Sequence, residues 1–262
     1  MSKYTKQNSI IGQLLNLINQ ATHETNDTLI AKALLESRYQ LENLSLDELS
    51  NKYYISQSTI SRFIKKMGYN NYNTFKNAVA VSNYKMADIH ILDHKDKNKD
   101  PLAIKQEVYD NILETFHNTN NIDIDHLIRI INIIKQYHTI IFLGSELSMA
   151  MCRILQLGLV ALGKNVYTIY DLNYQEQIIQ SVHGDSLVIC ISLEERWFLL
   201  QTSIEKLYKS NCYKILWTLK DKHIDNTKFN DVFLFGKPVK SNYGYNELMF
   251  FIMLVYRLIM NE

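Results

Sequence analysis

The sequence predicts two domains of different class: an all-α domain at the N-terminus and a three-layer α/β sandwich at the C-terminus. Up to residue 85, apolar residues recur at helical spacing, whereas after residue 137 short β-type runs alternate with amphipathic segments. A chain of 262 residues that is 47% hydrophobic can bury two modest cores. We expect a helical domain over residues 1–85, a linker over 86–105 and the α/β domain over 106–262.

The first domain is predicted as a string of helices. Ile10, Leu14 and Ile18 lie on one face of a helix, and Ile30, Ala33 and Leu34 lie on one face of the next. No Pro interrupts this part of the chain. Residues 93–100 are almost all charged or polar and are followed by Pro101, so we expect them to belong to the linker.

The second domain is predicted as a parallel sheet with helices on both faces. Helical stretches over 102–116 and 124–136 precede it, and the segments 147–162 and 198–210 are amphipathic. The apolar run 248–260 is too short to span a membrane, so we interpret it as a buried helix. The candidate strands are 138–143, 165–170, 186–192, 214–218 and 231–235.

The positive charge is concentrated in the first domain. Residues 1–85 contain ten Lys or Arg against six Asp or Glu, whereas residues 86–262 contain eighteen against twenty-one. From Ser50 to Lys85 there are six cations and no carboxylate. A segment with this charge is suited to a polyanion.

The segment 44–69 predicts two short helices joined by a tight turn. Ser45 and Glu48 form a capping box, so a helix should begin at Leu46 and end near Tyr53. Ser56 is a second N-cap, and Gly68 should end the helix that follows it. Two helices in this order are typical of a helix-turn-helix.

The second of these helices has one apolar and one polar side. Ile60, Phe63, Ile64 and Met67 form the apolar stripe, which leaves hydroxyl, amide and cationic groups on the other side. Short polar residues and Arg62 can reach base edges, and lysines can bind phosphates. A solvated basic surface helix is the plainer alternative. The candidate DNA-binding residues are Gln57, Ser58, Thr59, Ser61, Arg62, Lys65 and Lys66.

This region resembles the N-terminal domain of the RpiR/MurR family of transcription regulators. The family pattern has a Ser-x-x-Thr-x-x-Arg-Phe recognition helix, a Leu-Gly-Tyr-like ending and a Phe-Lys pair shortly after. Tyr54 departs from it, because a small or glycine-like residue is more usual in the turn. The matching residues are Ser56, Thr59, Arg62, Phe63, Gly68, Tyr69, Phe75 and Lys76.

The resemblance implies that the second domain is a SIS (sugar isomerase) domain, a five-stranded parallel sandwich that dimerises and binds phosphosugars. The expected effector contacts are Ser145 and Ser148 after the first strand, and Ser192 and Arg196 after the third. Ordinary helix capping is an equal alternative for Ser145 and Ser148.

The loop after the third strand departs from the Ser-x-Ser-Gly-Glu-Thr type of SIS domains. Glu194 and Glu195 replace a hydroxyl and the glycine, and Trp197 replaces the threonine. Two carboxylates repel a dianion, and without the glycine the backbone cannot approach it closely. Two hypotheses stay open: Arg196 supports a changed ligand, or the pocket is vestigial and the domain only dimerises.

The sequence contains no pattern typical of an enzyme, a metal site or a cofactor site. The eight His are scattered without metal-ligand spacing, and no phosphate-binding glycine motif or nucleophile elbow is present. We therefore expect no catalytic residues, no metal and no cofactor. Three Cys without C-x-x-C spacing and no leader-like N-terminus favour the cytoplasm.

These expectations combine into a transcription regulator of carbohydrate or amino-sugar genes. Its partners would be an operator in double-stranded DNA, one or more further copies of the chain and, if the pocket still binds a sugar phosphate, a phosphosugar effector, with no membrane. Paired C-terminal domains would hold two helix-turn-helix units at the spacing of a palindrome. The rival functions are a sugar-phosphate isomerase-like enzyme with an accessory helical domain and a scaffold whose basic helix binds an acidic protein.

Overall fold

The computed structural model describes residues 10–88, 99–193, 203–220, 225–237 and 244–261. The chain divides into two compact units, Met1–Asp96 and Lys97–Glu262. Each unit has its own buried apolar core.

The first unit is all-α, as predicted. Its core contains the inner faces of every helix described in this unit, with Leu34, Leu49, Ile64 and Phe75 at most 1% exposed. The helices are α1 (Ile10–Asn19), α2 (Asn26–Glu36), α3 (Leu46–Tyr53), α4 (Gln57–Lys66) and α5 (Tyr72–Asp88).

The ends of α3 and α4 lie where the capping residues predict them. The Ser45 Oγ accepts a hydrogen bond from the Glu48 N–H (3.1 Å), while the Glu48 carboxylate accepts one from the Ser45 N–H (2.7 Å). These bonds satisfy two backbone donors that the first turn of a helix leaves unpaired. The Ser56 Oγ caps α4 by accepting a hydrogen bond from the Thr59 N–H, without the reciprocal bond of a capping box. Gly68 follows α4 with a left-handed φ of 89°.

Tyr54, in the turn between α3 and α4, adopts a left-handed conformation. Its φ and ψ are 54° and 35°, and it is the C-cap of α3. Non-glycine residues rarely adopt this conformation because Cβ crowds the following carbonyl oxygen. The side chain is 96% exposed, so packing does not compensate for the strain.

The second unit contains a five-stranded parallel sheet in the order β2-β1-β3-β4-β5. The central strand β3 is buried along its whole length, as the apolar run predicts. The strands are β1 (Thr139–Gly144), β2 (Asn165–Thr168), β3 (Ser186–Ser192), β4 (Tyr213–Thr218) and β5 (Asp231–Leu234).

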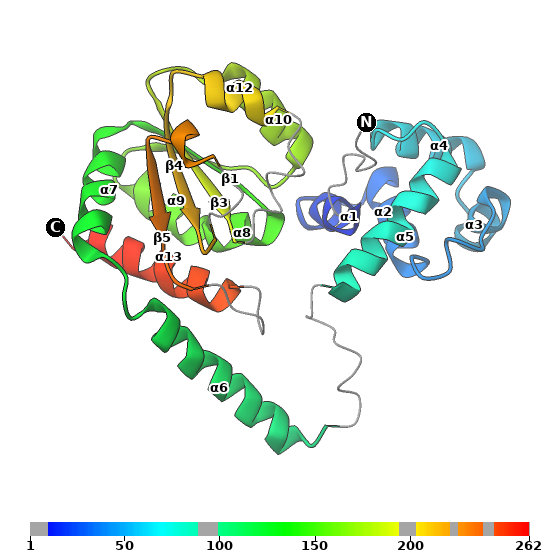
Figure 1. Cartoon of the computed structure of the whole chain (residues 1–262). Helices are drawn as coiled ribbons and strands as arrows, with labels where there is room; N and C mark the ends of the chain where they lie inside the picture. The colour runs from blue at the N-terminus through cyan, green and yellow to red at the C-terminus, as the bar shows by residue number, and fades with distance from the viewer. Residues whose placement is uncertain (1–9, 89–98, 194–202, 221–224, 238–243, 262) are drawn as a thin grey trace. The chain divides into compact units, whose positions relative to one another are not determined.

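Helices cover both faces of this sheet (Figure 1). Alternate strand residues such as Phe142 and Val188 enter two separate apolar clusters, because successive side chains of a strand point to opposite faces. One cluster includes α7 (Ile124–Gln136), α8 (Glu146–Met151), α9 (Arg153–Ala161) and α13 (Tyr245–Ile259). The other includes α10 (Leu172–Ser181) and α12 (Ile204–Lys209). The predicted three-layer α/β fold is confirmed.

Three parts of the structure differ from the sequence prediction. The single helix expected over 147–162 is divided into α8 and α9, which meet at Cys152. Helix α6 (Pro101–Thr119) begins inside the range expected as linker, because the Asp100 side chain caps the Leu102 N–H (3.3 Å) and Pro101 occupies the first turn, where no N–H is needed. Helix α5 likewise extends to Asp88.

We expect Tyr54→Gly to stabilise the first unit by about 0.5–1 kcal/mol, because relief of the left-handed strain exceeds the extra backbone entropy of glycine. Hydrogen exchange of the α3 and α4 amides in the full-length chain measures this free energy. Tyr54→Ala is the matched control, since it removes the exposed ring but keeps Cβ and the strain. Equal protection in the two variants would show that the turn is unstrained.

Candidate nucleic-acid interface and effector region

Helix α4 buries its apolar stripe and leaves its polar side open. Ile60, Phe63 and Ile64 are at most 3% exposed and belong to the core of the first unit. Of the seven candidate DNA-binding residues, Thr59 and Ser61 are half-buried and the other five are exposed. The structure therefore brings these seven residues together on the outward side of one helix.

Hydroxyl groups at the start of α4 contact one another, and one of them contacts the Arg62 guanidinium. The Ser56 Oγ lies 3.0 Å from the Ser58 Oγ and 2.7 Å from the Thr59 Oγ1. The Arg62 Nη2 in turn donates to the Thr59 Oγ1 (3.4 Å). This long, exposed contact orients the Arg62 side chain weakly, so the guanidinium can leave it for a stronger acceptor such as a guanine edge.

Gln57 is held by a residue of the preceding helix. Its Nε2 donates to the Asp47 Oδ1 (2.7 Å), while the other Asp47 oxygen accepts from the Asn51 Nδ2 (3.2 Å). Asp47 therefore positions the first residue of α4. No sequence pattern points to Asp47, because the contact joins residues of two different helices and corresponds to no recognisable spacing.

Lys66 is paired with a carboxylate of α2. Its Nζ donates to the Asp27 Oδ2 (2.5 Å), with the two side chains 70% and 34% exposed. An ion pair this exposed contributes little to stability. It does reduce the positive charge that Lys66 presents, although the sequence around α4 contains no acid. Asp27 lies 39 residues before Lys66, so sequence inspection alone did not connect the two.

Ser145 and Ser148 form a helix cap in the second unit. The Ser145 Oγ accepts from the Ser148 N–H (3.4 Å) and lies 2.8 Å from the Ser148 Oγ. Ser148 is buried, and α8 behind it has only six residues. Their hydroxyls thus already have partners, which is the arrangement expected of ordinary capping.

Two acidic residues, Glu146 and Asp171, lie near this cap. Burial raises the pKa of Glu146, and the negative charge of Asp171 raises it further. Glu146 is the first residue of α8, and Asp171 is the N-cap of α10. Two carboxylates next to the end of β1 oppose the binding of a phosphate there.

Several buried polar atoms near the ends of the strands have no hydrogen-bond partner among the described residues. Ser192, at the end of β3, is one of the expected effector contacts, and its Oγ is buried and unpartnered. Both carboxylate oxygens of Glu247 share this state, as do the Trp217 Nε1 and the Asn118 Nδ2. Such atoms are uncommon in native proteins and are candidates for ligand or water contacts.

No sequence pattern points to Glu247 or Asn118 as part of this region. Glu247 lies in the first turn of α13, just before the apolar run 248–260, and is fully buried. Both residues approach Gly236, after β5: a Cβ built there would lie 3.6 Å from the Glu247 Cγ and 3.5 Å from the Asn118 carbonyl oxygen. Arg196, Glu194, Glu195 and Trp197 lie outside the described residues.

Within the described ranges, the structure gives no support for a metal site, a reactive thiol or a membrane-spanning helix. No group of three His, Cys, Asp or Glu there could hold a metal ion. Cys152, Cys190 and Cys212 are free and buried, and burial raises the pKa of each thiol, which opposes thiolate chemistry. No described helix is both long enough and apolar enough to cross a membrane.

Residues 12–85 match the family model for the helix-turn-helix domain of the rpiR family. A curated relative, an uncharacterized HTH-type transcriptional regulator from Thermotoga maritima, is 24% identical over 165 residues, which is 62% of this chain and 59% of that protein. The match thus spans less than two thirds of the relative's length.

Two solved structures are similar to this chain. The sugar isomerase domain of an RpiR transcription factor from Sphaerobacter thermophilus has a TM-score of 0.51 and 16% identity, and the match covers 59% of this chain and 88% of that one. The NanR protein of Vibrio vulnificus, in complex with ManNAc-6P, has a TM-score of 0.49 and 16% identity, covering 96% and 91% of the two chains.

The family match and the first of these structures agree with the two domains described above. They confirm the resemblance that the recognition helix and its flanking residues predict. Residues 12–85 of this chain are a helix-turn-helix domain of the rpiR family, and an α/β domain with the fold of a sugar isomerase domain follows it.

Proposed function

We propose that this protein is a sequence-specific DNA-binding transcription regulator of the RpiR type. The observation that supports this most strongly is the open polar side of α4, whose apolar side is locked into the core. In this proposal Gln57, Ser58 and Arg62 contact base edges in the major groove, and Lys65 and Lys66 contact phosphates.

We further propose that α6 is the main surface by which two copies of the chain pair. This helix of 19 residues has only Thr115 and Thr119 buried. Seven large apolar side chains along it are each between 41% and 68% exposed. At 100° per residue these seven lie on one side of the helix, and Glu107, Asp110 and Glu114 lie on the other. The seven are Leu102, Ile104, Val108, Tyr109, Ile112, Leu113 and Phe116.

A second copy is the partner that fits this surface and the proposed function. An α-helix of this length extends about 28 Å, and a row of large apolar side chains along it is unfavourable in water. A two-fold interface lets the same face cover itself, and it supplies the two recognition helices that a palindromic operator requires.

The effector of the second domain differs, in this proposal, from the phosphosugars that bind SIS domains. The hydroxyls of Ser145 and Ser148 are already paired with each other, and Glu146 and Asp171 oppose an anion at the end of β1. Ser192 and Glu247 offer to a polar ligand oxygens that have no hydrogen-bond partner among the described residues. We therefore favour a changed ligand rich in hydrogen-bond donors over the vestigial pocket.

The isomerase-like alternative is not favoured. Proton transfer between substrate carbons needs a base close to a bound substrate. His126 and Asp231 do form a close pair (Nε2 to Oδ1, 2.6 Å). Asp231 begins β5, however, and ligands of parallel α/β sheets bind at the opposite edge, beyond the carboxyl ends of the strands.

We expect Arg62→Ala to lose discrimination at one base pair, by about tenfold, whereas Lys66→Ala weakens all duplexes alike. An operator is first selected from random duplexes with the wild-type chain, and the affinities for it and its single-base variants are then measured. Lys32→Ala, which removes a charge of α2 that is paired with Glu24, is the control. Wild-type specificity in Arg62→Ala would contradict the assignment of α4.

We expect Asp27→Asn to raise the affinity for all duplexes a few-fold, because it releases Lys66 for a phosphate. The slope of log K against log salt should become steeper by about 1, the contribution of one phosphate contact. Glu24→Gln removes an equal charge from the same unit and should leave the slope unchanged. An identical slope in all three proteins would show that Lys66 does not reach the DNA.

We expect Ile112→Glu to dissociate the dimer, since a carboxylate would be buried at the centre of the paired helices. Sedimentation analysis over a range of concentrations measures this, with His117→Glu, on the polar side of α6, as the control. Equal dissociation constants for Ile112→Glu and the wild type would place the pairing surface elsewhere.

A further inference from the structure

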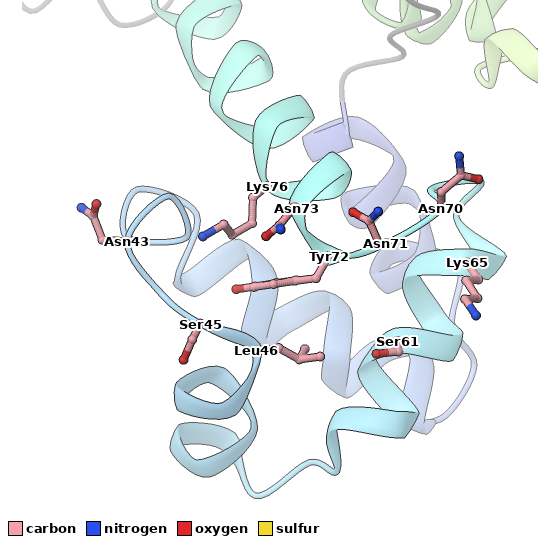
Figure 2. Close-up of a pocket in the computed structure, with 10 residues that line it drawn as sticks. All are labelled: Asn43, Ser45, Leu46, Ser61, Lys65, Asn70, Asn71, Tyr72, Asn73 and Lys76. Carbon is pink, nitrogen blue, oxygen red and sulfur yellow. The ribbon is translucent and has the colours of Figure 1, made fainter.

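A polar groove lies beside the recognition helix in the first unit. Its volume is about 660 Å³, and Figure 2 shows the residues that line it. They come from three places: the loop before α3 and the first residue of α3, one side of α4, and the start of α5 with the loop before it. The lining consists of Asn43, Ser45, Leu46, Ser61, Lys65, Asn70, Asn71, Tyr72, Asn73 and Lys76.

The groove is formed in the free protein by hydrogen bonds across its floor. The Lys76 Nζ donates to the carbonyl oxygens of Glu42 (2.8 Å) and Leu44 (3.1 Å). The Tyr72 hydroxyl donates to the same Leu44 oxygen (3.2 Å), and burial raises the pKa of Tyr72 to about 12, so this donor persists at neutral pH. These contacts fix the loop before α3 against α5, so a ligand need not organise the walls.

The chemistry of the groove is that of an anion site. Four amides, three hydroxyls and two ammonium groups line it, and none of its lining residues is acidic. The adjacent Glu48 carboxylate is committed to the Ser45 N–H and hydroxyl (2.7 and 2.8 Å). Lys65 is exposed and has no ion-pair partner among the described residues, in contrast to Lys66.

The first turn of α5 adds backbone donors at the same place. Asn71 caps this helix of 17 residues: its Oδ1 accepts from the Thr74 N–H (2.9 Å). The N–H groups of Tyr72 and Asn73 lie in the first turn, before the first N–H that can donate to a carbonyl oxygen of the same helix. They form the positive end of the helix dipole. They therefore reinforce the lysines in attracting negative charge.

The position of the groove identifies the anion. Ser61 and Lys65 lie one turn apart on α4 and form one wall of the groove, while Ser58 and Arg62 form the neighbouring row of the same helix. A helix that reads bases in the major groove is flanked by a sugar-phosphate strand. We propose that this groove receives a phosphodiester of the operator and thereby sets the register of α4 on the DNA, an inference that rests on the proposed function.

In this arrangement the polar side of α4 has two tasks. Arg62 and Ser58 contact bases, whereas Ser61 and Lys65 act together with Asn71 and Asn73 as positioning contacts to one strand. A change in the groove should therefore weaken all duplexes alike and leave the preference among base pairs intact.

The test is Asn73→Asp in the full-length chain. Asn73 is exposed and is the second residue of α5, where a carboxylate interacts favourably with the helix dipole. The thermal stability should therefore be maintained or raised, while the affinity for the selected operator should fall by about tenfold or more, because a like charge now faces the phosphate. Asn77→Asp, one turn further along α5 and outside the groove, is the matched control.

Duplexes with one neutral methylphosphonate linkage identify the group that is bound. At the proposed position, the neutral linkage should weaken binding of the wild type and strengthen binding of Asn73→Asp. If Asn73→Asp binds the operator like Asn77→Asp, or no linkage has opposite effects on the two proteins, the groove does not hold the DNA backbone. Tight binding of inorganic phosphate by the wild type, with no effect of Asn73→Asp on the operator, would likewise overturn it.

These outcomes are separate from those of the proposed function. A wild-type chain that selects no duplex contradicts DNA recognition itself. In a second outcome, the chain selects an operator and loses discrimination with Arg62→Ala, but Asn73→Asp has no effect. This outcome supports the proposed function and contradicts only the role of the groove.

Discussion

The burial of the apolar side of α4 is the constraint on which the rest of the first unit depends. Ile60, Phe63 and Ile64 can enter the core only if the helix is rotated so that Arg62 and Lys65 point outward. The hydrophobic effect, which has no direction of its own, therefore fixes the direction of the polar groups. Because the core also includes residues of α2, α3 and α5, these helices become the rigid support of the same polar surface.

Charged residues around α4 restrain the polar side chains that burial of the apolar side turns outward. Asp27 and Asp47 both precede the basic segment Ser50–Lys85 in the chain, and they hold Lys66 and Gln57 at opposite ends of α4. Lys65, between them, faces a groove with no acidic lining residue. A duplex therefore meets a surface on which Arg62 and Lys65 are open cations while Lys66 and Gln57 are restrained by other residues of the protein, which is a basis for orientation as well as attraction.

In the second unit, the fold and the polar groups at the strand ends point to different ligands. Its sheet and helices have the fold of sugar isomerase domains, yet carboxylates lie beside the cap where an anion was expected. Buried oxygens of Ser192 and Glu247 without described partners lie in the same unit. A domain can keep its fold while its ligand changes, because the fold depends on the apolar faces of the sheet and the ligand depends on a few polar groups at the strand ends.

The sequence by itself determined the class of each domain, the five strands, and the ends of α3 and α4, because these depend on periodicity and on residues within four positions of each other. It also determined which side of α4 is polar. Only the tertiary structure decided that Asp27 pairs with Lys66, that Asn73 and Lys65 share a groove, and that Glu247 is buried with no hydrogen-bond partner in the described part of the chain. Each of these involves groups distant in sequence or the burial of a charged residue, and short-range pattern carries no information on which distant side chains meet.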